Sequence, residues 1–153
     1  MGAQGVWWAT LTVWGVVNGV NLLQSAGFLS RVATGSMALN HKIGVAIMLL
    51  ALPATAALVA YVRAGSDWRL WVGPALFDVF VVFMLLVEYV RPIEFRSPAR
   101  PAVLVPYLVL FFGSILFMGL PMFRIDLGLW AVTAVTASIL LASMVFAMIR
   151  GVG

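Results

Sequence analysis

The chain contains no cysteine and a single histidine among its 153 residues. The absence of cysteine excludes disulfides, thiolate metal sites, iron–sulfur clusters and thiol catalysis. With only His41 available, a single chain cannot ligate haem through two histidines, and most histidine-based metal sites are excluded as well. We therefore expect neither a bound metal nor a cofactor.

Charged residues are also scarce. They make up 9% of the chain, against about 25% in soluble domains, while 64% of the residues are hydrophobic. Such a composition excludes a soluble core and indicates a polytopic membrane protein with one domain over residues 1–153. The formal net charge of +4 does not indicate nucleic-acid binding, because the basic residues lie at the ends of the predicted helices and in the loops, where we expect them to contact lipid head groups.

Long apolar runs are what the chain has in abundance. Five of them approach the 20 or so residues that a helix needs to cross a bilayer, namely 6–23, 43–62, 70–90, 102–122 and 127–149. Helices are required because lipid offers the backbone no hydrogen-bond partners, and membrane strands would alternate in hydropathy. The sequence therefore predicts an all-α bundle of five transmembrane helices.

The loops between these runs differ in basic residues. Six lie on one side of the predicted membrane: Arg31, Lys42, Arg91, Arg96, Arg100 and Arg150. Three lie on the other: Arg63, Arg69 and Arg124. The positive-inside rule places the larger group in the cytoplasm, which gives an N-out/C-in orientation. We expect an integral protein of a bacterial or archaeal cytoplasmic membrane.

The predicted loops also differ in length. Residues 64–69 and 123–126 form short outer loops that allow only antiparallel neighbours. The longer inner segment 25–42 either extends the first helix or forms a short helix in the membrane interface. In the other inner loop, 91–101, three prolines prevent a regular helix, and we expect Arg96 and Arg100 to contact anionic lipid head groups.

Polar residues form a stripe on the first helix. Asn18, Asn21 and Ser25 follow one another at helical spacing, with Gln24 beside them. In lipid these side chains must face protein or water. They either form hydrogen bonds between helices or line a ligand site or conduit, and the spacing alone leaves both open.

The third predicted helix carries a carboxyl group, Asp78, about eight residues from its start. Such an acid costs roughly 2.5 to 3.5 kcal/mol on insertion scales. No basic residue lies at its depth in any predicted helix. Asp78 is therefore protonated, hydrogen-bonded by neutral groups such as Asn18, or paired with a cation from outside the chain. It either binds a proton or cation in function or only holds the first and third helices together.

Near the cytoplasmic end of the same helix, Glu88 is placed to pair with Arg91. Together with Gln24 and His41 they form either a polar vestibule or a set of separate interfacial residues. Neither interpretation needs catalysis, and the sequence contains no catalytic motif.

Three hypotheses about function follow. The leading one is an ion- or solute-transport unit, built as a homo-oligomer, in which Asp78 binds the ion, Asn18 and Asn21 line the path, and Glu88 lies at its mouth. The second is an accessory or structural subunit of a larger membrane complex. The third is a binder of lipid-like ligands or a membrane enzyme, for which we find the least support.

Overall fold

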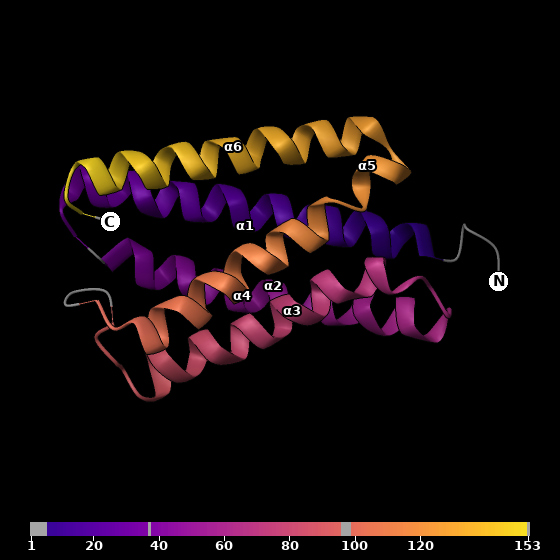
Figure 1. The fold of residues 1–153 in the computed structure, drawn as a ribbon, viewed down its shortest axis with the longest axis horizontal. Helices are drawn as coiled ribbons and strands as arrows, with labels where there is room; N and C mark the ends of the chain where they lie inside the picture. Colours follow the sequence, from indigo (N-terminus) through magenta and orange to yellow (C-terminus); the bar gives the residue numbers. More distant parts are fainter. Residues whose placement is uncertain (1–5, 37, 96–98, 153) are drawn as a thin grey trace.

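The computed structural model describes residues 6–36, 38–95 and 99–152, and these residues form an all-helical bundle (Figure 1). The helices are α1 (Trp7–Thr34), α2 (Ala38–Arg63), α3 (Trp68–Met84) with its π-helical continuation η2 (Leu85–Val90), α4 (Pro101–Gly119), the short α5 (Met122–Ile125) and α6 (Leu127–Ile149). The all-α prediction is confirmed.

Four of these segments are long and apolar enough to cross a membrane: Ala38–Arg63, Trp68–Val90, Pro101–Ile125 and Leu127–Ile149. Only 28–33% of the residues in the most apolar part of each segment are buried by protein, and the others are half-buried or exposed. These features identify an integral membrane protein.

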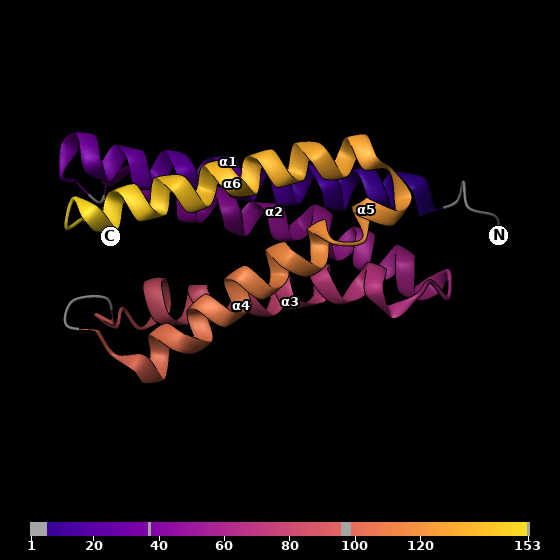
Figure 2. The same cartoon turned by 45° about the horizontal axis from the view of Figure 1, so that its top comes forward.

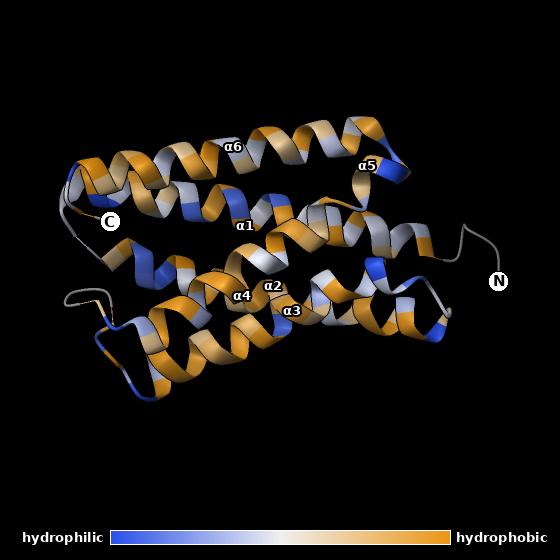
Figure 3. Ribbon diagram, in the orientation of Figure 1, coloured by the Kyte–Doolittle hydropathy of each residue, from blue (hydrophilic) through white to orange (hydrophobic). Residues whose placement is uncertain are grey.

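Helix α1 is longer than the other helices but less apolar. Its 28 residues include asparagines, a glutamine and several hydroxyl residues, and Figure 3 shows hydrophilic residues part-way along it. Length and composition therefore do not establish α1 as a fifth membrane span. The predicted crossing of α1, and the N-out/C-in orientation that depends on it, stay predictions.

The helix boundaries agree with the apolar runs except in two loops. Helix α1 extends to Thr34 and α2 begins at Ala38, so most of the segment 25–42 is helical and extends both neighbours. Gly35 ends α1 in the left-handed conformation, at φ 65°. The outer loop predicted at 123–126 is largely the helical turn α5.

Two aspartate side chains cap α3 and α6 at the short connections that precede these helices. The Asp67 carboxylate accepts a hydrogen bond from the Arg69 amide at 2.9 Å and so caps α3, while Asp126 accepts one from the Leu129 amide at 3.0 Å and caps α6. A capping carboxylate satisfies one of the amides that a helix N-terminus leaves without a partner. These caps fix where α3 and α6 begin.

The helices pack in a definite order. Helix α1 contacts α2 and α6, α2 contacts α3, and α3 contacts α4. Figure 2 shows α3 and α4 as a pair on one side of the bundle and α6 on the other. Polar contacts join α1 to α6 at a constant separation of 115 residues, which requires the two helices to run parallel.

The α3–α4 contact is the most aromatic part of the core. The Phe80 ring lies 5.2 Å from that of Tyr107 and 5.3 Å from that of Phe111, between centroids. Gly73 on α3 permits the close approach of the α4 backbone, because a Cβ at residue 73 would lie only 2.6 Å from the Met118 nitrogen. The absence of one side chain thus brings two helix backbones together.

Candidate functional site

Asp78 contacts a hydroxyl group on the neighbouring helix. Its Oδ2 lies 2.9 Å from Oγ1 of Thr55 on α2. Asp78 is 10 residues from the start and 12 from the end of the segment Trp68–Val90, so it lies near the middle of the span. The Asp78–Thr55 pair is therefore a polar contact about 15 Å, by helix rise, from the Trp68 end.

The geometry of Thr55 bears on the protonation of this acid. The same Thr55 oxygen also lies 2.8 Å from the carbonyl oxygen of Ala51. A hydroxyl carries one proton, so Thr55 either shares that proton between the two oxygens or accepts a hydrogen bond from a protonated Asp78. Protonation would also avoid the cost of a charge in lipid. The arrangement therefore favours a neutral Asp78.

The second carboxyl oxygen supports the same assignment. Oδ1 of Asp78 is covered by protein and has no hydrogen-bond partner among the described residues. An ionised carboxylate needs donors at both oxygens, and burying it without them is far more costly than burying a neutral acid.

The Asp78–Thr55 pair lies at the outer surface of the bundle. Asp78 is half-buried and Thr55 is exposed, and next to them Leu52 is 71% exposed. We call this surface the α2–α3 edge and define it by Leu52, Thr55 and Val59 on α2 and by Asp78 and Val82 on α3. Thr55 thus carries a hydroxyl group to the surface of the bundle, while Oδ1 of Asp78 is covered by protein and Oδ2 contacts Thr55.

Asn18 is not the neutral partner of Asp78. Its amide nitrogen donates to the Trp14 carbonyl at 2.7 Å and to the Thr133 hydroxyl at 3.2 Å, and its oxygen accepts from the Thr136 hydroxyl at 2.6 Å. Thr133 and Thr136 are both on α6. The contact that we considered between the first and third helices is instead one between α1 and α6, while Asp78 joins α3 to α2.

Asn21 continues the same polar seam. This residue is fully buried, and its amide nitrogen donates to the Thr136 hydroxyl at 3.1 Å. Its side-chain oxygen has no partner among the described residues. Thr136 thus joins both asparagines, and the polar stripe is an interhelical contact over this stretch. Gln24 is half-buried, and no hydrogen bond of its side chain is found within the described ranges.

A second polar region lies at the end of the bundle where α2 begins. The Tyr89 hydroxyl donates to the His41 carbonyl at 2.9 Å, and the two rings are 4.5 Å apart between centroids. Glu88 precedes Tyr89 in the π-helical segment η2, whose i→i+5 hydrogen bonding shifts the side-chain register. Glu88 is half-buried, whereas His41 and Arg91 are exposed. The structure thus brings His41 next to η2 through Tyr89.

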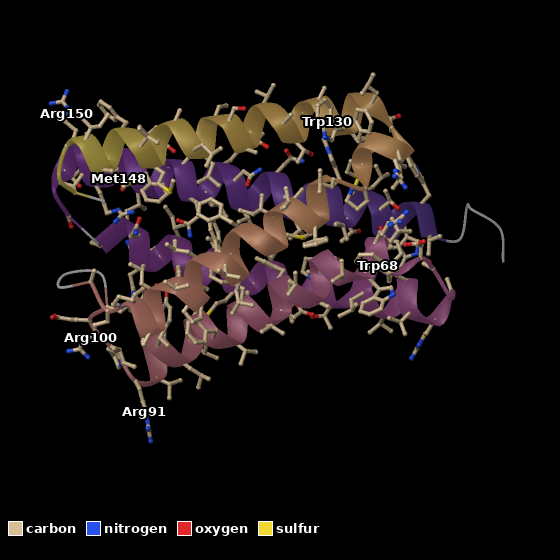
Figure 4. All side chains as sticks on the ribbon, viewed as in Figure 1. Trp68, Arg91, Arg100, Trp130, Met148 and Arg150 are labelled. Atoms are coloured by element: carbon tan, nitrogen blue, oxygen red, sulfur yellow. The ribbon has the colours of Figure 1, made fainter. Side chains whose placement is uncertain are left out.

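Figure 4 shows Arg91, Arg100 and Arg150 at one end of the bundle and Trp68 and Trp130 toward the other. Arg100 is exposed just before α4, as a contact with lipid head groups requires. The corresponding prediction for Arg96 falls outside the described residues. Arg31 belongs to the same end and is buried, with its guanidinium 4.7 Å from the Phe28 ring centre.

Sequence reasoning missed Thr55 and Tyr89. Thr55 gave one signal, a hydroxyl residue in an apolar run two positions after Pro53, but no pattern links it to a particular residue of α3. The threonines Thr133 and Thr136 are typical of a closely packed face, yet their partners depend on the parallel placement of α1 and α6.

The described residues contain no group of three or more His, Cys, Asp or Glu side chains placed to hold a metal ion. Comparison of the chain with known protein families, with curated proteins and with solved structures finds no match.

Proposed function

We propose that the protein is a membrane subunit that functions by lateral assembly with other transmembrane helices, and that the α2–α3 edge is its assembly surface. The observation that carries the proposal is the outward position of the Asp78–Thr55 pair near the middle of the membrane. Thr55 is exposed, and a polar group on a partner helix can hydrogen-bond to this threonine where lipid cannot.

The interior of the bundle supports this function over a self-contained transporter. Asn18 and Asn21 are occupied by contacts with α6, and Asp78 makes its hydrogen bond with α2. The residues expected to form one path are thus divided between two separate helix contacts. A subunit that completes its polar edge with a neighbour needs no such internal path.

The test is native mass spectrometry after gentle extraction from the native membrane. The wild-type chain is expected in a defined assembly with further membrane polypeptides, either copies of itself or other chains. Asp78→Leu and Thr55→Val should release it as a monomer. Ser138→Ala serves as a control, because Ser138 is exposed on α6 and donates only to the Ala134 carbonyl of its own helix at 2.8 Å. A wild-type chain that is monomeric and monodisperse contradicts the proposal.

Ion transport is a second candidate, favoured by one observation. A carboxyl near mid-membrane, with an oxygen that lacks a donor, is the kind of group that binds and releases a proton or cation. In this case an assembled neighbour would complete the path at the α2–α3 edge. Proteoliposomes should then show ion flux that is lost in Asp78→Asn and retained in Ser138→Ala. Full flux in Asp78→Asn would eliminate this candidate.

A further inference from the structure

Helix α1 is not identified as a membrane span by its length and composition, yet it lies between two helices that are, α2 and α6 (Figure 1). We infer that α1 is a fifth span whose crossing depends on α6. Contacts with its neighbours hold it across the bilayer, and its own hydropathy does not.

The packing of α1 is the first argument. Near one end of α2, the Tyr61 hydroxyl donates to the Thr10 hydroxyl of α1 at 3.0 Å. Near the other end of α2, a Cβ at Gly27 of α1 would overlap the Asn40 side chain. Helix α1 therefore follows α2 over most of its length, and it also runs parallel to α6. A helix packed along two membrane spans in this way crosses the same bilayer.

The outward face of α1 is the second argument. In the stretch 8–29, the exposed residues are spaced by three, four or seven positions and so share one face of the helix: Trp8, Leu11, Gly15, Leu22, Ala26 and Leu29. This face has no polar side chain and is ~31 Å long by helix rise, close to the hydrocarbon thickness of a bilayer. A helix lying in the membrane interface would turn polar residues outward. The outward face of α1 is suited to lipid along a complete crossing.

The inward face explains why α1 needs α6. Three side-chain hydrogen bonds join Asn18 and Asn21 to α6, and each of them involves Thr133 or Thr136. Without α6 these amides would lose those partners in lipid, and an amide without a partner opposes insertion. Because the partners are 115 residues or more apart in the chain, α1 obtains them only after α6 has been synthesised.

The crossing can be tested by cysteine labelling of the full chain, which has no natural cysteine. Gln4→Cys reports the side that precedes α1, and Arg150→Cys reports the side that follows α6. With five spans, an impermeant maleimide added to intact cells should label only one of these two variants, and the other only after permeabilisation. If both variants are labelled from the same side, α1 does not cross and the inference is wrong.

The dependence on α6 needs a second set of variants in the Gln4→Cys background. Thr133→Val combined with Thr136→Val removes the three hydrogen bonds and keeps the side-chain shapes. We expect the ratio of crossed to uncrossed chains to fall about tenfold. Ser138→Ala on the same helix is the control and should leave the ratio unchanged, because Ser138 donates only within α6.

A compensating change separates this effect from a general loss of packing. Adding Asn18→Leu and Asn21→Leu to the double threonine variant removes the amides that need partners, so the crossing should return to the wild-type level. The label reports the side on which residue 4 lies even where a variant packs poorly. Unchanged labelling in the double threonine variant would show that α1 crosses without these contacts. A loss that the leucine substitutions do not restore would show that the asparagines are not its cause. Either result overturns the dependence on α6.

Discussion

The Thr55 hydroxyl on α2 and the Asp78 carboxyl on α3 meet at 2.9 Å on the outer surface of the bundle. They lie 8 residues before the end of α2 at Arg63 and 10 residues after the start of α3 at Trp68, which places the contact near the middle of the membrane. This contact joins two helices at the surface, unlike that of the exposed Ser138, which bonds only within α6.

This contact should contribute measurably to the stability of the monomer. Thr55→Val removes the hydroxyl without changing the side-chain shape and is expected to lower the free energy of unfolding by about 0.6 kcal/mol, with an upper value of ~1.7 kcal/mol. A double-mutant cycle with Asp78→Leu, measured in detergent under dilute conditions where the chain is monomeric, isolates the pair. Additive effects would show that the two residues do not interact.

Thr136 should matter more than Thr133 in the α1–α6 contact. Thr136→Val removes the donor to Asn18 Oδ1 and the acceptor for Asn21 Nδ2, so two buried amides lose partners. Thr133→Val removes one contact of Asn18 Nδ2, which keeps the Trp14 carbonyl. We expect a loss of about 1–3 kcal/mol for Thr136→Val and less for Thr133→Val, measured by reversible unfolding in mixed micelles. Equal losses would contradict this contact pattern.

Gly73→Ala should be among the most damaging small substitutions. The added Cβ would lie 2.6 Å from the Met118 nitrogen and from the Phe117 carbonyl carbon, and backbone atoms in a packed helix cannot move aside easily. We expect a cost of about 1–3 kcal/mol in thermal or denaturant unfolding. Gly113→Ala on α4 is the control, because its Cβ would approach only Leu76, at 3.9 Å, and alanine favours helix.

Gly44 and Tyr89 should be coupled. A Cβ at residue 44 would overlap the Tyr89 hydroxyl, which donates to the His41 carbonyl at 2.9 Å. Gly44→Ala is therefore expected to displace the ring and lower the unfolding temperature. In a Tyr89→Phe background the same substitution should cost less, because the overlapping oxygen is gone. If Gly44→Ala lowers the unfolding temperature by the same amount in that background, the Tyr89 hydroxyl does not lie against residue 44.

The orientation can be measured by single-cysteine labelling, again from a cysteine-free chain. In intact cells, an impermeant maleimide should label Asp67→Cys and Arg124→Cys, and should label Ser36→Cys and Arg150→Cys only after permeabilisation. This result would give α2 and α6 the orientation that the distribution of basic residues predicts and, because α1 runs parallel to α6, would place the N-terminal end of α1 outside. Labelling of Ser36→Cys and Arg150→Cys from opposite sides would show that α1 and α6 do not cross in parallel.

Helix formation and membrane residence follow from local composition. A run such as 127–149 leaves the backbone no solvent partner in lipid, so it must be helical, and α6 has the same limits as the apolar run. Residues 24–34 of α1 are more polar than the runs, so hydropathy ended the first apolar run at residue 23 and left open whether the helix continues, as it does to Thr34. The caps at Asp67 and Asp126 are local as well.

The partners of the polar residues depend instead on how the helices pack. Asn18 and Asp78 are both intramembrane polar groups, and hydropathy gives their depth but not the direction in which each faces. Close approach at Gly73 and the parallel placement of α1 and α6 set those directions. They leave Asn18 inside the bundle with Thr136 and Asp78 at its edge with Thr55, because side-chain shape and hydrogen-bond geometry select one packing among many of similar hydropathy.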